Sequence, residues 1–508
     1  MPLFFWFFLL SVDLFLSPTV YCFSVESVLT QVNRSKRAPG GCTRSSSLGA
    51  MKYEGQVENI QGEVSGNSSG GAVVGVGVVC MDILALVKKF PKPDEKIRTT
   101  ETVFQGGGNV GNTLTGLSRL QVPSAIVTKV GDDDNGWRLT EEFKEEGIDT
   151  SGVVVVKGMP SSFTFVVICA ETQTRTCINT PQPEPLCLSD MKPELLESIE
   201  TSLKRRVSWL HVDGRIPNSD LQMVRICRAR WGGSGHANGV LEEGQHVSFR
   251  SPMVSGEFEK DRGRGMWSLL PELDLVFSNA NFPKVVNGLA KAEEGVSSHI
   301  CDEVSELKCE DQECWNQVAA LFESEAAFRD HLAGMCSLFF LSKRKLVVST
   351  IGEKGSVGVM PGPLGPDEEG IGLADVKGSW RPPDGSGEGG GKSRVSSLVF
   401  SCLEPVTRQR VRLRLLHCSA WPLREGEGVK DSTGAGDAFI AGFIAEAMRR
   451  QARGGGSIGS REPIAEKKME VPWYDDVASA LCSGSWVASR SLTAVGSRPG
   501  LPFASKKK

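Results

Sequence analysis

The sequence predicts an α/β protein built on a mainly parallel β-sheet, and three observations support this. Residues 72–80 form one continuous apolar run, which is typical of a strand buried on both faces. Between residues 99 and 349, short strand-like runs alternate with segments of helical periodicity, as they do in βαβ units. The length of 508 residues and the hydrophobic content of 40% suit one large globular domain with additional segments, or two domains.

The same patterns assign the elements in chain order. After the first run, strands are expected at 99–104, 125–130, 153–156, 163–170, 209–212, 274–277 and 346–349. Helices are expected at 112–120 and 137–146, from residue 221, and directly after Asp437. A loop is expected at 132–136, because acidic residues, Asn and Gly cluster there.

Three segments interrupt the alternation and are predicted to be insertions, near 231–252, 294–337 and 361–393. The first and third are rich in Gly and polar residues, whereas the second contains Cys and Glu and is expected to be helical. The third includes Gly-Gly-Gly-Lys-Ser, but Ser386 stands where a P-loop needs its first glycine, and no strand precedes it. We therefore reject a P-loop.

The first 71 residues differ in composition from the rest. Residues 3–16 are apolar, but the run is short for a membrane span and contains Asp13, so 1–22 is predicted to be a signal-peptide-like segment. Residues 23–71 are predicted to be a basic, transit-peptide-like segment followed by a Gly/Ser-rich linker. Together they resemble the plastid-targeting leader of algae with complex plastids. We expect a plastid location and no stable membrane span in the mature form; the secretory pathway and the cytoplasm are the alternatives.

Charge and cysteine content exclude some classes of protein. The formal net charge is −4, so no nucleic-acid partner is expected. The 14 cysteines are scattered without C-x-x-C pairs, which favours reduced core cysteines over a zinc site or a disulfide framework. The Gly-x-Gly in 72–80 has no third glycine, which argues against a dinucleotide-binding fold.

The most informative motif is Asp-Ser-Thr-Gly-Ala-Gly-Asp at 431–437, which precedes an apolar run of helical spacing. A glycine-rich turn that opens a helix presents unpaired N–H groups at the positive end of the helix dipole, and so can bind phosphate. A carboxylate is repelled by bound phosphate. Asp437 therefore makes sense as a base that removes a proton from an attacking hydroxyl, and an ordinary helix N-cap is the alternative.

Two motifs together resemble the signatures of the PfkB, or ribokinase-like, carbohydrate kinases. Residues 431–437 are similar to the second signature of this family, and the glycine-rich 106–120 is similar to the first. The resemblance implies one kinase domain over 72–505, with a ribokinase-like three-layer α/β/α fold, a mainly parallel central sheet and a small β-lid formed near 99–104 and 153–180. It is nearest to a plant and algal ketohexokinase-like subgroup, which is similar to this chain at 90–98, 174–178 and 496–502.

The resemblance also implies roles for individual residues. Asp437 would be the catalytic base, and the N–H groups of Gly434, Ala435 and Gly436 would form an anion hole. The sugar would contact Asp82, Gly107, Gly108, Asn109 and Asn112. The nucleotide would contact Thr350, Gly352, Gly355 and Gly496, and a K⁺ ion would bind near Asp431 and Thr433. A helix N-cap is the alternative for Asp82, and a plain turn is the alternative for 350–355.

One position departs from the family pattern. Relatives often carry Asn-x-x-Glu, which helps to organise Mg²⁺, whereas Phe282 takes the place of the glutamate here. Mg²⁺ would then bind mainly through ATP itself. We expect an ATP- and Mg²⁺-dependent kinase for a ketose or related sugar, and a homodimer, because relatives often dimerise through the lid. The alternatives are a non-catalytic regulatory or scaffold protein of a plastid complex, and a nucleoside kinase of the same fold.

Overall fold

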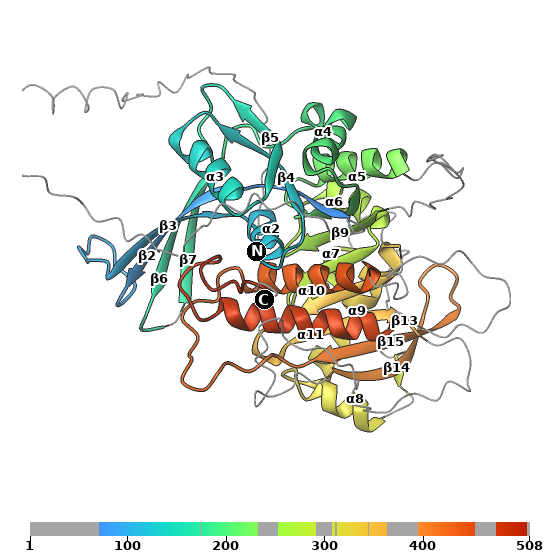
Figure 1. The fold of residues 1–508 in the computed structure, drawn as a ribbon. Coiled ribbons are helices and arrows are strands. Elements are labelled where there is room, and N and C mark those ends of the chain that lie inside the picture. The colour runs from blue at the N-terminus through green and yellow to red at the C-terminus, as the bar shows by residue number, and fades with distance from the viewer. Residues whose placement is uncertain are drawn as a thin grey trace, which may run out of the picture. The chain divides into compact units, whose positions relative to one another are not determined.

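The computed structural model describes residues 71–172, 174–231, 252–290, 307–309, 312–343, 345–362, 395–452 and 474–504 (Figure 1). The chain divides into two compact units, Met1–Gly66 and Asn67–Lys508, and every described residue belongs to the second. The leader and linker, and nearly all of the insertions at 231–252 and 361–393, lie outside the described residues, so these assignments stay predictions. Within the described ranges, no helix combines the length and apolarity needed to cross a membrane.

An eleven-stranded sheet forms the centre of this unit, in the order β11-β14-β15-β13-β12-β10-β9-β8-β1-β4-β5. Every pairing from β12 through to β5 is parallel, and the remaining four pairings are antiparallel. The strands are β1 (Ala72–Val76), β4 (Ser124–Gly131), β5 (Asp149–Val156), β8 (Val207–Val212), β9 (Met253–Phe258), β10 (Leu275–Asn279), β11 (Lys308–Cys309), β12 (Leu346–Thr350), β13 (Ser356–Pro361), β14 (Val395–Leu403) and β15 (Arg410–Cys418).

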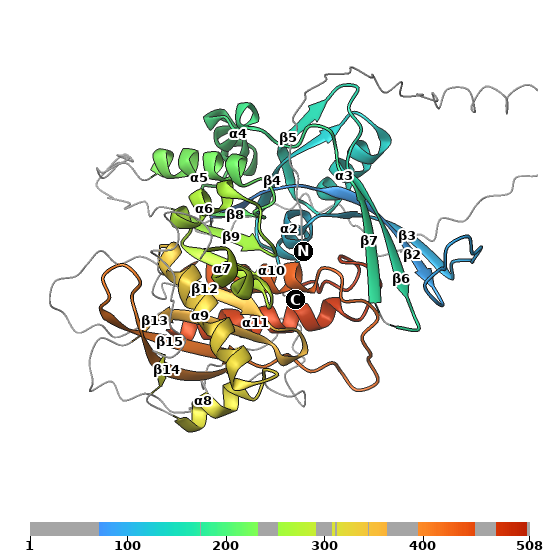
Figure 2. The same cartoon turned by 180° about the vertical axis from the view of Figure 1, so that it is seen from behind.

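Helices cover both faces of this sheet, because alternate side chains of each buried strand point to opposite sides. Val73 joins one hydrophobic cluster with Phe443 and Trp486, while Val74 joins the other. The layer that lies in front in Figure 1 contains α2 (Asn109–Arg119), α3 (Asp134–Glu145), α10 (Ala435–Ala452) and α11 (Tyr474–Ser491). The opposite layer, in front in Figure 2, contains α4 (Pro193–Leu203), α5 (Pro217–Trp231), α6 (Arg264–Leu269), α7 (Phe282–Ala290), α8 (Gln312–Ala319) and α9 (Glu325–Leu341). The predicted three-layer α/β/α architecture is confirmed.

A second sheet of four strands, in the order β3-β2-β6-β7, forms the lid. Its strands are β2 (Cys80–Val87), β3 (Glu101–Gly107), β6 (Phe163–Cys169) and β7 (Thr174–Thr180). The predicted lid is therefore present, with one correction. Residues 153–156 belong to β5, which is the edge strand of the main sheet and pairs with β4.

Several element boundaries differ from the predictions. The apolar run 72–80 is not one strand: β1 ends at Val76, and β2 begins at Cys80 in the other sheet. The backbone N–H of Val78 donates to Asp213 Oδ2 (2.9 Å), and this contact lies at the break. Helix α3 begins at Asp134 inside the predicted loop, because Asp133 caps it by accepting from the N–H of Gly136.

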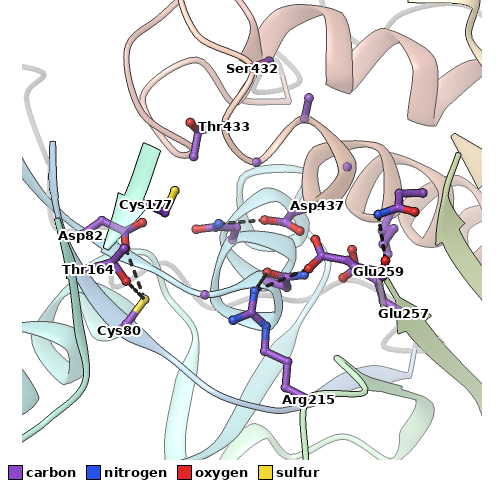
Figure 3. A pocket seen from close by; sticks show the side chains of 18 of the residues that line it. Cys80, Asp82, Thr164, Cys177, Arg215, Glu257, Glu259, Ser432, Thr433 and Asp437 are labelled. Carbon is purple, nitrogen blue, oxygen red and sulfur yellow. Dashed lines mark hydrogen bonds and ion pairs between the residues drawn. The ribbon is translucent and has the colours of Figure 1, made fainter. Parts of the chain in front are cut away.

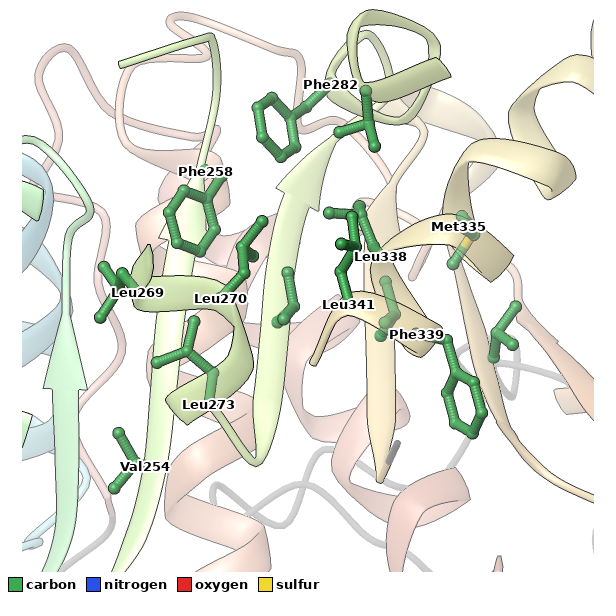
Figure 4. Close-up of a cluster of buried hydrophobic side chains, with 14 of the residues drawn as sticks. Val254, Phe258, Leu269, Leu270, Leu273, Phe282, Met335, Leu338, Phe339 and Leu341 are labelled. Carbon is green, nitrogen blue, oxygen red and sulfur yellow. The ribbon is translucent and has the colours of Figure 1, made fainter. Parts of the chain in front are cut away.

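The segment 294–337, predicted as a helical insertion, contains α8 and most of α9 in its described part. Helix α9 is not peripheral, because its side chains from Leu332 to Phe340 are buried in the core. Figure 4 shows Met335, Leu338 and Phe339 of this helix in the same buried cluster as Val254 and Phe258 of β9. This part of the predicted insertion is thus one of the helices that cover the sheet.

The close packing of α9 on α7 depends on a glycine. A Cβ atom at Gly334 would lie 2.0 Å from the backbone oxygen of Pro283, so the two helices must separate to accept it. We expect Gly334→Ala to lower the free energy of unfolding by about 1–3 kcal/mol, as overpacking does. In the control Gly288→Ala, on the exposed side of α7, the new Cβ meets nothing within 4 Å. That change should instead stabilise the helix by about 0.5–1 kcal/mol. Urea titration of both variants measures the difference, and equal stabilities would contradict this packing.

Candidate active site

A cleft of about 480 Å³ lies where the lid, the ends of the central parallel strands and the N-terminus of α10 meet. It is lined from all three sides (Figure 3): by Asp82 and Thr164 of the lid, by Arg215 and Glu257 after or at strand ends, and by Gly434–Asp437. The carboxyl ends of parallel strands are where α/β proteins bind ligands. The two sequence motifs, far apart along the chain, therefore meet in one cleft.

The loop that opens α10 is held by Asp431. Its Oδ1 accepts from the backbone N–H and the hydroxyl of Thr433 (2.9 and 2.7 Å), and its Oδ2 accepts from the N–H of Gly496 (2.9 Å). Gly434 adopts φ 74°, and a Cβ there would lie 2.5 Å from Cβ of Ser497. Only glycine suits this position, and Asp431 has a structural task besides the cation binding that was predicted for it and Thr433.

The predicted anion hole lies at the start of α10, beside the cleft. Gly434, Ala435 and Gly436 all line it, and a Cβ at Gly436 would meet nothing within 4 Å, so there is room for a ligand. The N–H group of Ala435 already donates a long hydrogen bond (3.3 Å) to the carbonyl oxygen of Ser432. The other amides of a first helical turn have no acceptor within their own helix, and they form the positive end of the helix dipole.

Asp437 lies in the first turn of α10 and is buried. Its Oδ2 accepts a hydrogen bond of 2.8 Å from Nδ2 of Asn112, a residue of the first motif. Burial disfavours the charged carboxylate and raises the pKa of Asp437 to about 7, although the hydrogen bond from Asn112 acts in the opposite direction. A carboxyl group with this pKa can accept a proton near neutral pH.

Both asparagines of the first motif have fixed orientations. Oδ1 of Asn112 accepts from the hydroxyl of Ser497 (2.9 Å) and from Nε of Arg498 (3.3 Å). Oδ1 of Asn109 accepts from Nη2 of Arg215 (2.7 Å). Asn109 begins α2 directly after Gly108. Gly108 has a φ of 91°, and a Cβ on this residue would lie 2.3 Å from the carbonyl oxygen of Val78, so the position requires glycine.

Asp82 lines the cleft from the third position of β2, so the alternative of a helix N-cap is wrong. Burial raises the pKa of Asp82, and a hydrogen bond from Cys80 Sγ to its Oδ1 (3.2 Å) lowers it. Gly107 lies beside the carboxylate, since a Cβ there would be 2.1 Å from Oδ2 of Asp82. Gly107 itself is not part of the cleft wall and instead leaves space for Asp82.

Of the four residues predicted to contact the nucleotide, one lines this cleft and three do not. Thr350 lines the cleft at the end of β12, whereas Gly352 and Gly355 lie in the turn before β13 and are absent from its wall. Gly496 is also absent from the wall. Its φ is 93°, and a Cβ would lie 2.4 Å from Oε1 of Gln105, so the structure places it in the contact between the lid base and the Asp431 loop.

Three charged residues of the cleft were not predicted, namely Arg215, Glu257 and Glu259. Burial, and then repulsion from Asp437 and Glu259, raises the pKa of Glu257 well above its usual value. Its Oε2 is buried and has no hydrogen-bond partner among the described residues. Carboxylate oxygens are the ligands that Mg²⁺ takes. The position of Glu257 and Glu259 at and just after the end of β9 was the available signal, but that strand was not predicted.

Phe282, the residue that departs from the Asn-x-x-Glu pattern, has a structural role. Asn279 Oδ1 accepts from the backbone N–H of Phe282 (2.9 Å) and so caps α7. The phenyl ring is fully buried and stacks on Phe258, with ring centres 5.7 Å apart. This position therefore contributes packing, and only Asn279 of the motif reaches the cleft.

Comparisons with known proteins agree with this picture for the first part of the domain. Residues 72–219 match the family model described as pfkB family carbohydrate kinase. The ketohexokinase of Mus musculus is 25% identical over 150 residues, which are 30% of this chain and 48% of that protein. A ribokinase of Dictyostelium discoideum is 30% identical over 93 residues, which are 18% of this chain and 29% of that protein. The chain thus spans about half or less of the curated relatives that it matches.

Among solved structures, the ribokinase of Arabidopsis thaliana complexed with ribose and ATP aligns with a TM-score of 0.49 and 15% identity, covering 86% of this chain and 96% of that one. The family match begins at β1, extends past β8, and includes Asp82, Asn109 and Asn112. The residues that match the pfkB family model, 72–219, are therefore those that build the lid side of the cleft.

Proposed function

We propose that this protein transfers the γ-phosphoryl group of ATP to a hydroxyl group of a sugar. The observation that carries the proposal is the 2.8 Å hydrogen bond between Asn112 and Asp437 inside the cleft. It holds a buried carboxyl group, whose pKa is about 7, in the first turn of α10. A base next to a phosphate-binding helix end is the arrangement that hydroxyl phosphorylation needs.

In this mechanism Asp437 accepts the proton of the attacking hydroxyl, while the amides of Gly434–Gly436 stabilise charge on the transferred phosphoryl group. Arg215 is positioned to counter the charge of the phosphates, since it lines the same cleft. Glu257 and Glu259 would hold Mg²⁺, which neutralises phosphate charge when it is bound with ATP. Because ADP is a good leaving group, positioning and charge neutralisation should account for most of the rate enhancement.

The lid side of the cleft supports a polyol as the acceptor. It presents Asp82, Thr164 and Asn179 together with Asn109, which offer both hydrogen-bond donors and acceptors. A ketose or related sugar is our first choice. A nucleoside kinase is the second candidate, and a panel of both acceptor classes separates the two. The burial of Phe282 favours a third candidate, a regulatory protein without phosphoryl transfer, which turnover on any acceptor would exclude.

We expect Asp437→Asn to lower kcat by about a hundredfold or more, because the amide cannot accept the proton. The measurement is ADP release with ATP and a panel of ketoses, pentoses and nucleosides. Asp134→Asn removes the same charge from the exposed first turn of α3 and should leave kcat unchanged. Full activity of Asp437→Asn, or no turnover of the unaltered protein on any acceptor, would overturn the proposal.

The pH dependence should report the same carboxyl group. Because burial raises the pKa of Asp437 to about 7, its proton-accepting form predominates only above that pH. We expect kcat/KM to fall about tenfold per unit as the pH drops below about 7, and to level off above it. The profile is measured at saturating ATP with a varied acceptor. A flat profile from about pH 5.5 to about 8.5 would exclude a single base of this kind.

We also propose that the chain forms a homodimer through the outer face of the lid. Phe104, Phe165 and Ile178 are 60%, 46% and 58% exposed on adjoining strands of this face. The outward positions of the four strands carry no charged residue, and so a second copy of the same face complements it. The register places these outward residues at Ile83, Ala85, Thr102, Phe104, Phe163, Phe165, Val167, Thr176, Ile178 and Thr180.

We expect Phe165→Lys to shift the protein from dimer to monomer in sedimentation velocity runs, because it places a charge in the interface. Val155→Lys changes another exposed apolar residue, on β5 (58% exposed against 46% for Phe165), and should leave the dimer intact. A monomeric unaltered protein at micromolar concentration would refute the dimer.

A further inference from the structure

Four polar side chains form a hydrogen-bonded chain across the lid, and all four line the cleft. Nδ2 of Asn179 on β7 donates to Oγ1 of Thr164 on β6 (3.0 Å). That hydroxyl donates to Sγ of Cys80 on β2 (3.5 Å), and the thiol donates to Oδ1 of Asp82 (3.2 Å). Figure 3 shows Thr164, Cys80 and Asp82 side by side. The chain therefore runs from β7 across β6 to β2 and ends on a carboxylate of the acceptor side.

The order of donors and acceptors in this hydrogen-bonded series follows from its first member, Asn179. The Nδ2 group of Asn179 also donates to the backbone carbonyl of Phe163 (3.3 Å), which can only accept, and this fixes the orientation of the amide. Thr164 therefore accepts from Asn179 and has its one proton free for Cys80. Cys80 in turn accepts from Thr164 and has its one proton for Asp82.

The two carboxylate oxygens of Asp82 differ in their hydrogen-bond partners. Oδ1 receives the thiol proton, and a hydrogen bond from Thr164 also acts to lower the pKa of this carboxyl group. None of the hydrogen bonds found among the described residues ends on Oδ2. The carboxylate packs against Gly107, because a Cβ there would lie 2.1 Å from Oδ2, so glycine is needed for Asp82 to take this position in the cleft wall. An ionised carboxylate in a cleft is stabilised by hydroxyl groups that donate to it, so Oδ2 is the free acceptor on this side.

We infer that Cys80 is a positioning residue for the acceptor: its S–H group holds Oδ1 of Asp82 and leaves Oδ2 to accept a hydroxyl of the bound polyol. This inference rests on the proposed function. Burial raises the pKa of the Cys80 thiol to about 12, so the thiol keeps its proton throughout the range of an assay. The cysteine thus acts as a hydrogen-bond donor and not as a nucleophile.

The test separates acceptor binding from ATP binding. Cys80→Ala removes the donor, and we expect the KM of the acceptor to rise about tenfold, the effect of losing one hydrogen bond to a charged group. The KM of ATP should stay within about twofold, because no member of the chain is on the α10 side of the cleft. Cys80→Ser keeps an O–H donor and should recover most of the loss.

Two further variants control for structural damage. Cys227→Ala removes another buried thiol, on α5, and should change neither KM. Thr164→Val removes the hydroxyl of the chain at constant shape and should raise the KM of the acceptor but not that of ATP. An unchanged acceptor KM in Cys80→Ala, an equal rise in both KM values, or a serine variant as poor as alanine would overturn the inference.

An infrared measurement keeps this result distinct from failure of the proposed function. The S–H stretching band of Cys80, isolated by subtracting the Cys80→Ala spectrum, should lie at low frequency and move to higher frequency in Asp82→Ala. A band that does not move refutes the hydrogen bond, whether or not the protein has activity. No turnover together with a shifted band refutes the kinase function and the acceptor role of Cys80, and leaves only the hydrogen bond.

Discussion

The hydrogen bond between Asn112 and Asp437 is the contact on which the site depends, because it joins two parts of the chain separated by 325 positions. The helices that carry these residues, α2 and α10, pack closely enough that a Cβ at Gly116 would lie 2.6 Å from that of Ala441. Thr113 adds a hydrogen bond to the backbone carbonyl of Asp437 (3.4 Å). The packing of two helices on one face of the sheet thus sets the geometry of the base.

Buried charge is the second constraint on this cleft. Burial raises the pKa of Asp437, Glu257 and Asp213, and Arg215 is the cation that partly offsets their repulsion. Arg498 is a second buried cation, next to Asn112: it forms an ion pair with Glu142 (2.9 Å) and lies over the ring of Phe143. Such an arrangement costs stability in the free protein, and a bound cation would relieve it.

Sequence patterns predicted the parts of the molecule that depend on local chemistry. Asp437 and its glycines are recognisable because a helix end and a carboxylate lie within seven residues, and β12 is recognisable as an apolar run. The break between β1 and β2 could not be predicted, since the contact there joins Val78 to Asp213, 135 positions away. Glu257 and Arg215 become neighbours only through the order of β8 and β9 in the sheet. The alternating apolar residues of β14 and β15, in contrast, were visible and were missed.

The contacts of Ser497 and Arg498 with Asn112 have a consequence for biosynthesis. These residues emerge from the ribosome nearly four hundred positions after the asparagine whose amide they orient, as the sequence separations of 385 and 386 show. Pairing of strands that are distant in the sequence is slow, because the entropy cost of closing a long loop comes before the stabilising contacts form. During translation the first motif would therefore lack these contacts until almost the whole polypeptide has been synthesised. In this interval the incompletely folded domain is most prone to aggregation, and chaperones are most needed.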